Sequence, residues 1–134
     1  RRVLELHGNW SRLTCTGCGE HFTLDDVDGA RSGAVPRCPA CSSVLRPDIV
    51  FYGEMLDNDV MEGAVRAISE ADLLIVAGTS LVVYPAAGLI DYYAGERLVL
   101  MNATPTPYDS RADLIIREPV GQVFQELERL GRLP

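Results

Sequence analysis

The sequence predicts an α/β protein: part of a doubly wound parallel sheet that carries a small inserted metal-binding module. Strand-like and helix-like segments alternate with short links after Pro47, as in sheets whose parallel strands are joined by helices. Within residues 12–46 apolar periodicity disappears, and cysteine, glycine, serine and proline crowd together. Such a segment buries little apolar surface, so we expect a metal to hold it. That segment is the predicted module, and residues 1–11 with 47–134 form the sheet domain.

Hydrophobic periodicity sets the order of the elements in the sheet domain. The expected strands are short apolar runs at residues 3–6, 48–52, 73–77, 97–101 and 113–117. The expected helices run from a cap at Asp57 or Asn58 to Ala71, from Pro85 to Tyr93, and from Val120 to Leu130. The uninterrupted apolar run at 73–77 is typical of a strand covered on both faces. Ligands bind beyond the carboxyl ends of parallel strands, so we expect the turns at Gly78, Asn102 and Tyr52 to form one functional edge.

Composition and charge exclude several classes of function. The chain has 134 residues, of which 47% are hydrophobic, and a net charge of −7. An acidic surface repels phosphate backbones, which disfavours nucleic-acid binding and leaves a basic protein partner possible. No apolar run approaches the ~20 residues that span a bilayer, and the amino-terminal residues lack the apolar stretch of a signal peptide. We therefore expect a cytoplasmic protein with no nucleic-acid or membrane partner.

The cysteines form two C-x-x-C pairs, Cys15 with Cys18 and Cys38 with Cys41. This spacing is typical of a zinc site with four thiolate ligands, and it predicts that the inserted module is a four-cysteine zinc ribbon. Because the thiolates fill all four tetrahedral positions, the zinc is expected to be structural rather than catalytic. Two disulfides or unbound thiols are the alternatives, and the absence of an export signal favours the metal.

Further motifs flank the cysteine pairs in a fixed order. They are Leu6-His7-Gly8-Asn9, the R-P-D-I-V-F-Y-G-E segment at 46–54, the A-D-L-L-I-V-A-G-T-S-L-V-V-Y-P-A-A segment at 71–87, and N-A-T-P-T-P-Y-D at 102–109. Together with the C-x-x-C pairs, these motifs resemble the sirtuin family of NAD-dependent protein-lysine deacylases, from about Leu4 to Leu127. The resemblance implies that the sheet domain is a Rossmann-like, NAD-binding domain.

The resemblance assigns His7 the role of general base. It would take a proton from a ribose hydroxyl of NAD after the acyl oxygen of the substrate has displaced nicotinamide. A histidine suits this step because its ordinary pKa lies near neutrality. A capping or core histidine is the plainer alternative. His21 lies outside the motifs and is expected to be a surface or packing residue.

The resemblance also implies two sets of binding residues. The NAD-binding set is Gly78, Thr79, Ser80, Asn102, Ala103, Thr104 and Val120. The substrate-binding set is Val50, Phe51, Gly53, Glu54 and Val82. These last residues are expected to wall a cleft in which an acyl-lysine peptide lies as an added strand. Many relatives have an acid where Thr104 stands, which is a departure from the family pattern.

Three further motifs of the family do not occur in this chain: a glycine-rich phosphate loop, a G-I-P-D-F-R-like segment and a Q-N-x-D segment. In the family they precede the L-H-G motif. We therefore expect a fragment of a longer enzyme whose missing N-terminal half is its partner. Two hypotheses follow: a deacylase that releases nicotinamide and O-acyl-ADP-ribose when that half is present, or a non-catalytic, zinc-bearing binding or regulatory module.

Overall fold

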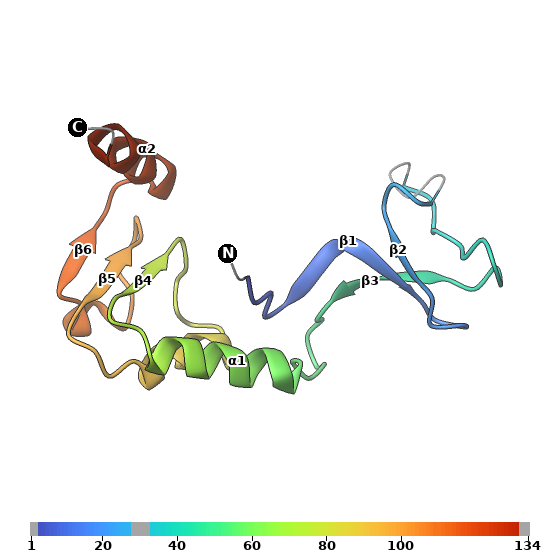
Figure 1. Cartoon of the computed structure of the whole chain (residues 1–134), viewed down its shortest axis with the longest axis horizontal. Helices are drawn as coiled ribbons and strands as arrows, with labels where there is room; N and C mark the ends of the chain where they lie inside the picture. Colours follow the sequence, from blue (N-terminus) through green and yellow to red (C-terminus); the bar gives the residue numbers. More distant parts are fainter. Residues whose placement is uncertain (1–2, 28–32, 132–134) are drawn as a thin grey trace. The chain divides into compact units, whose positions relative to one another are not determined.

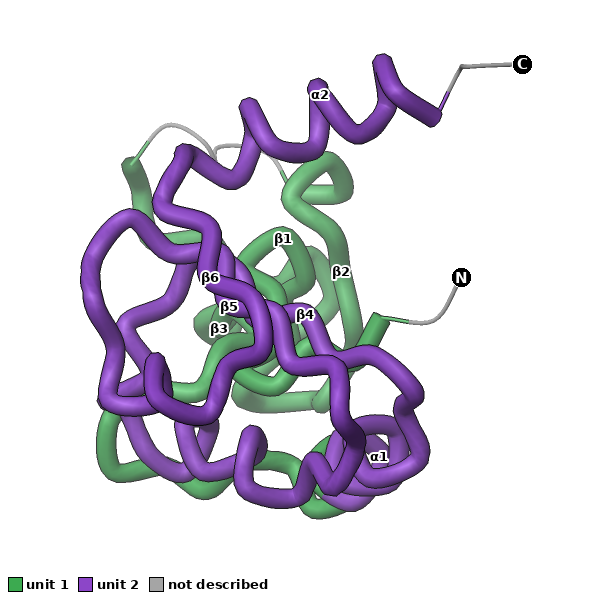
Figure 2. Tube along the Cα trace, turned by 90° about the vertical axis from the view of Figure 1, so that its left-hand side faces the viewer, with its two compact units in different colours: residues 1–61 green, residues 62–134 purple. Residues whose placement is uncertain are grey.

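The structure is a computed structural model that describes residues 3–27 and 33–131. The chain divides into two compact units, unit 1 with residues 1–61 and unit 2 with residues 62–134 (Figure 2). Within the described ranges, no helix combines the length and the apolar character that crossing a membrane requires.

Unit 1 contains a three-stranded antiparallel sheet in the order β2-β1-β3 (Figure 1). Its strands are β1 (Gly8–Cys15), β2 (His21–Thr23) and β3 (Leu45–Ile49). Thr14, in β1, ties the three strands together, since its hydroxyl donates to the Asp48 carboxylate at 2.6 Å and lies 3.0 Å from Nδ1 of His21. His21, expected at the surface or in packing, therefore bonds across the sheet.

The core of unit 1 is small and mixes aliphatic side chains with cysteines. Its buried members are Leu13, Cys15, Leu24, Val27, Cys38 and Leu45. Apolar burial stabilises by about 25 cal/mol per Å², but two of these six side chains are cysteines, and Phe22 is the one partly buried hydrophobic residue packed against them in the described part of the chain. The unit therefore depends on a further constraint, which its cysteines are placed to provide.

Two predictions about unit 1 are wrong in detail. Residues 3–6 form no strand, because the Gly8 N–H bonds back to the Glu5 carbonyl at 2.9 Å and closes a turn. The strand predicted at 48–52 ends at Ile49, because the next residues turn, with the Glu54 N–H on the Phe51 carbonyl at 3.0 Å. The 12–46 segment contains β2, the second half of β1 and the start of β3.

Unit 2 is built on a parallel sheet in the order β4-β5-β6 (Figure 1). Its strands are β4 (Leu74–Ala77), β5 (Leu98–Met101) and β6 (Leu114–Ile116). The parallel sheet and the order of its strands confirm the predicted α/β class. The core gathers on one face around Leu98 and Leu100, and its other buried members are Leu81, Ile90, Tyr93 and Tyr108.

The opposite face of β4 is open in unit 2. Leu74 and Val76 pack against the core, whereas Ile75 is 42% exposed and Leu114 is 51% exposed. The expectation that the 73–77 strand is covered on both faces is therefore wrong for the described residues. Alternate side chains of a strand point to opposite faces, so an uninterrupted apolar run also fits a strand with only one covered face.

The helices follow the predicted order. Helix α1 (Asn58–Ser69) is capped by Asp57, whose carboxylate accepts the Val60 N–H at 3.0 Å, as an N-cap does. Helix α2 (Val120–Gly131) closes the described part of unit 2. Between them, the predicted α-helix at 85–93 is a 3₁₀ helix, η1 (Ala86–Tyr92), and a short 3₁₀ helix, η2 (Asp109–Arg111), was not predicted.

Candidate metal centre and candidate active site

The four cysteines of unit 1 come together as predicted. Their Sγ atoms all lie within 4.8 Å of one another. Cys15 and Cys41 are 3.4 Å apart, and Cys18 and Cys38 are 3.7 Å apart. A tetrahedron of thiolates at about 2.3 Å from zinc has sulfur–sulfur edges of about 3.8 Å, whereas a disulfide requires about 2.05 Å. The thiols are free and fit a zinc ion.

Two tight turns aim these thiols at a common point. In the first turn, the Gly19 N–H bonds to the Cys15 carbonyl at 3.0 Å, and in the second the Ser42 N–H bonds to the Cys38 carbonyl at 2.8 Å. Gly17 lies where the two turns meet. A Cβ at Gly17 would collide with the Ser43 side chain and lie 3.4 Å from the Cys41 sulfur. Glycine therefore permits the close approach of the two C-x-x-C turns.

Hydrogen bonding already favours thiolate character in part of the cluster. The hydroxyl and then the backbone N–H of Ser43 lower the pKa of Cys41 to about 6. At Cys18 the Glu20 N–H lowers the pKa, but hydrogen bonds with the other thiols, Cys15 first, raise it to about 12. The metal-free cluster therefore holds protons that a divalent cation displaces on binding.

The turn that carries His7 is fixed on both sides through its backbone. The His7 carbonyl accepts the Val50 N–H at 3.1 Å. Gly8 has φ +77°, and a Cβ there would run into the Asp48 carbonyl, so only glycine fits. The imidazole of His7 is exposed. Unit 1 thus places the predicted base directly beside Val50, the first residue of the predicted substrate-binding set.

Glu5 and Arg12, which the motif analysis did not single out, reinforce the His7 turn together with Asn9. The carboxylate of Glu5 accepts the Asn9 side-chain amide at 2.7 Å and the Arg12 guanidinium at 2.6 Å. The hydrogen bond to Asn9 and then the one to Arg12 lower the pKa of Glu5. In the sequence, the only indication of this role is that Glu5 and Asn9 lie two residues before and after His7.

The predicted substrate-binding residues of unit 1, from Val50 to Glu54, form a turn that is held by side-chain hydrogen bonds. The Glu54 carboxylate accepts the Arg46 guanidinium at 2.5 Å and the Phe51 N–H at 3.0 Å. Arg46 also lies over the Phe51 ring, 5.1 Å from its centre. The hydrogen bond from Arg46 is the main cause that lowers the pKa of Glu54. The Glu54 carboxylate therefore holds the turn, and Phe51, Gly53 and Tyr52 are left exposed on it.

Unit 2 brings the main residues of the predicted NAD-binding set to one edge of its sheet. Gly78 follows β4, and its N–H bonds to the Met101 carbonyl at 2.9 Å. Asn102 follows β5, and its N–H bonds to the Ile116 carbonyl at 3.0 Å. Val120 opens α2, and one of its methyl carbons lies 4.0 Å from the position of a Cβ on Gly78. These residues meet at the carboxyl ends of parallel strands, where ligands bind in such folds.

The remaining members of the predicted sets lie on the turns after these strands. Thr79 uses its hydroxyl to accept the Leu81 N–H at 3.3 Å, and Ser80 is exposed. Ala103 is exposed, and Thr104 contributes its carbonyl to the Asn102 turn. Val82 is 58% exposed in unit 2. How Val82 lies relative to the substrate wall of unit 1 stays a prediction, as does the inclusion of the Tyr52 turn in a common edge.

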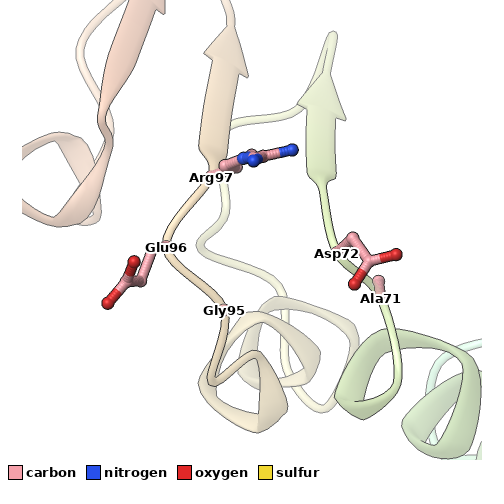
Figure 3. A pocket seen from close by; sticks show the side chains of 5 residues that line it. All are labelled: Ala71, Asp72, Gly95, Glu96 and Arg97. Atoms are coloured by element: carbon pink, nitrogen blue, oxygen red, sulfur yellow. The ribbon is translucent and has the colours of Figure 1, made fainter.

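A hollow of about 470 Å³ lies at the other end of the same sheet. It is lined by Ala71, Asp72, Gly95, Glu96 and Arg97, with Glu96 pointing away from Asp72 and Arg97 (Figure 3). These residues precede β4 and β5, so the hollow is at the amino ends of the strands. None of the predicted site residues lines it.

Comparison with known proteins identifies the family. The family model described as the Sir2 family matches residues 1–85. The NAD-dependent protein deacetylase of Clostridium acetobutylicum is 47% identical over 125 residues, which are 93% of this chain and 51% of that protein. The corresponding protein of Staphylococcus aureus is 42% identical over 127 residues, 95% of this chain and 51% of that protein.

Solved structures agree with these relatives. A Sir2 structure with a p53 peptide and NAD⁺ superposes with a TM-score of 0.85 at 39% identity, covering 100% of this chain and 57% of that one. A Sir2 structure bound to an acetylated peptide gives 0.85 at 38% identity, covering 100% and 58%. The chain belongs to the Sir2 family, and it spans about half the length of the curated relatives that it matches.

Proposed function

We propose that this chain contributes to an NAD-dependent protein-lysine deacetylase, acting together with the family motifs that it does not itself contain. The observation that carries the proposal is the convergence of Gly78, Asn102 and Val120 at the carboxyl edge of the parallel sheet. That edge lies in a chain whose relatives are named NAD-dependent protein deacetylases. Its substrates are then NAD and an acyl-lysine protein or peptide.

In the proposed reaction, the acyl oxygen of the substrate attacks the nicotinamide ribose, and nicotinamide leaves with the electrons of its bond. His7 then accepts a proton from a ribose hydroxyl, whose oxygen attacks the resulting O-alkylamidate. Water completes the release of free lysine and O-acyl-ADP-ribose. The exposed imidazole on a rigid turn suits His7 to this exchange of protons with a bound ligand. The adjoining Val50 N–H donates to the His7 carbonyl at 3.1 Å, which holds the two residues next to each other.

The zinc in this proposal is structural. Cys15, Cys18, Cys38 and Cys41 fill all four tetrahedral positions and leave none for substrate or water. Its task is to fold the small sheet from which both the His7 turn and the Phe51 turn extend. Thiolates at this site require a reducing compartment, which agrees with the expected cytoplasmic location.

The experiment is an NAD-dependent deacetylation assay on an acetylated peptide, with release of nicotinamide as the readout. It compares the 134-residue chain with an extended protein that includes the coding sequence preceding Arg1. We expect turnover from the extended protein and none from the 134 residues alone, since the phosphate loop is not among them. His7→Ala in the extended protein should abolish turnover, whereas the matched change His21→Ala should retain it.

An extended protein that binds NAD and acetylated peptide without turnover, with His7 intact, would contradict the enzymatic proposal. It would favour the non-catalytic binding module. Zinc analysis is separate from this outcome, because a structural ion is expected under both hypotheses. If His7→Ala retained turnover, His7 would not be the general base, although the proposed NAD-binding edge of unit 2 would still stand.

A further inference from the structure

One arginine of unit 2 contacts the predicted cofactor edge although no motif singled it out. Arg117 directly follows β6, whose last pairing places Ile116 beside Met101 of β5. The side chain of Arg117 therefore starts next to the turn at Asn102, where β5 ends. It is half-buried, with 37% of its surface exposed.

The guanidinium of Arg117 bonds to both ends of this turn. One terminal nitrogen donates to the Asn102 carbonyl at 3.0 Å and to the Thr104 carbonyl at 2.9 Å. The other terminal nitrogen is paired with the Asp109 carboxylate. A planar guanidinium with several fixed donors can bridge such acceptors, whereas the compact ammonium of a lysine cannot span them in the same way.

The Asn102 side chain depends on the same carbonyl. Its amide nitrogen donates to the Thr104 carbonyl at 2.9 Å and lies 3.3 Å from the Thr104 hydroxyl. The Thr104 carbonyl thus accepts from Asn102 and Arg117 together. Fixing this oxygen fixes the direction in which the Asn102 side chain points.

Asp109, the carboxylate partner of Arg117, is held by hydrogen bonds to a buried residue. Asp109 opens η2, and its second carboxylate oxygen accepts the Thr106 N–H at 3.1 Å and the Thr106 hydroxyl at 2.8 Å. Thr106 is buried. Arg117 therefore joins an anchored carboxylate to an exposed turn, and loss of the guanidinium would leave the turn held by β5 and by Asn102 alone.

We propose that Arg117 is a positioning residue for NAD: it pre-orders the Asn102–Thr104 turn so that Asn102 is already oriented for the adenosine ribose. The inference rests on the proposed function, because the resemblance assigns Asn102 to that ribose. A turn that is ordered before the ligand arrives spares the binding step the cost of ordering it. Arg117 acts through Asn102, and its effect belongs to NAD affinity rather than to the chemical step.

The experiment measures NAD and peptide separately in the extended protein, for wild type, Arg117→Gln, Arg117→Lys and the matched control Arg111→Gln. Arg111 is also partly exposed and pairs with a carboxylate, Asp91, at 2.5 Å within unit 2, but among the described residues its guanidinium does not contact the Asn102 turn. Hydrogen bonds to charged groups support an effect of about tenfold. Arg117→Gln should raise KM for NAD by about this factor and leave KM for the peptide unchanged.

Arg117→Lys should lie between wild type and Arg117→Gln, and Arg111→Gln should leave KM for NAD unchanged even where it lowers the unfolding temperature. A double-mutant cycle adds a test that a merely structural role would not pass. In an Asn102→Ala background, Arg117→Gln should have little further effect on NAD binding, because interacting residues are non-additive. Additive effects, or an unchanged KM for NAD in Arg117→Gln, would overturn the inference.

Calorimetric titration with NAD separates this inference from the proposed function. A wild-type protein that binds NAD without deacetylating the peptide contradicts the function, while weaker NAD binding by Arg117→Gln alone still supports the role of Arg117. Equal NAD binding by wild type and Arg117→Gln overturns that role whether or not the protein is a deacetylase. A parallel loss in Arg117→Gln and Arg111→Gln also overturns it, since both would then act through general stability.

Discussion

The two units of the chain are held together by different means. The core of unit 1 includes Cys15 and Cys38, two of the candidate zinc ligands, among a few aliphatic side chains. The core of unit 2 contains no cysteine and is built from leucine, isoleucine and tyrosine around Leu98 and Leu100. Among the described residues, each core has six buried members, but one partly buried hydrophobic residue packs against the core of unit 1 and five pack against that of unit 2. We therefore expect a bound metal to stabilise unit 1 and apolar packing to stabilise unit 2. Substitutions in unit 1 should therefore lower its zinc content, whereas substitutions in the core of unit 2 should lower the free energy of unfolding without loss of zinc.

The largest effect is expected from Cys38→Ser. Cys38 is buried, and removing its thiolate breaks the tetrahedral ligand set. Structural zinc contributes about 10 kcal/mol or more to folding in small zinc domains, so unit 1 should lose both its zinc and its antiparallel sheet. Zinc content per chain and far-ultraviolet circular dichroism measure the two losses. A variant that keeps one zinc per chain would contradict the assignment of Cys38.

The second largest effect is expected from Leu100→Ala, which tests the packing of unit 2. Leu100 is among the most fully buried side chains, and its removal leaves a cavity in unit 2. Substitutions of this kind cost about 2–5 kcal/mol. Urea denaturation should show this loss while the zinc content stays at the wild-type level. Loss of zinc in Leu100→Ala would mean that the two units do not depend on separate forces.

Gly8→Ala should have a smaller effect that is confined to unit 1. The new methyl group would meet the Asp48 carbonyl at a residue with φ +77°, and strain of this kind costs about 1–3 kcal/mol. Gly33→Ala is the matched control, because Gly33 has φ +82° but nothing within 4 Å of an added Cβ. Urea denaturation should rank Gly8→Ala as the more damaging change. Since Gly8 adjoins His7, turnover by the extended protein should also fall further in Gly8→Ala.

The smallest effect concerns acid stability in unit 2. Hydrogen bonds from the Thr106 hydroxyl and then from Arg117 hold the pKa of Asp109 below its ordinary value. A carboxylate whose pKa is lower in the folded state stabilises the fold at neutral pH, and this contribution is lost as the pH falls through that lowered value.

The stability difference between wild type and Asp109→Asn should therefore be present at pH 6 and shrink below about pH 4. Urea midpoints followed through amides of unit 2 would measure it. A difference that stays constant down to pH 3 would show that the charge of Asp109 is not what matters. Thr106→Val is a useful companion, since it removes the hydroxyl that contributes most to the lowered pKa.

Much of this architecture could be predicted from the sequence because local patterns carried it. The C-x-x-C spacing predicted the four-thiol cluster, and the apolar runs predicted β4, β5 and β6 in the right order. The antiparallel sheet of unit 1 was not specified because β1 and β3 contain few apolar residues, β2 has three residues, and the sheet is completed by long-range pairing of β1 with β3. The open face of β4 was missed because an apolar run does not say how many faces are covered.

The side chains that position the candidate site were harder to predict than the site itself. Arg46 and Glu54 lie in one motif, but their pairing depends on a turn that closes between them. Arg117 reaches the Asn102 turn only because parallel pairing sets β6 beside β5. Such contacts depend on how a turn closes or how strands pair, so the fold is needed to find them.

Amide hydrogen exchange during zinc chelation tests the central claim most directly, since it reads both units of one sample. We predict that removing zinc exposes the amides of β1, β2 and β3 to fast exchange while those of β4 and β5 remain protected. Protection that survives in the β1–β3 sheet after complete removal of zinc would contradict the claim that a metal holds unit 1. So would a simultaneous loss of protection in β4 and β5.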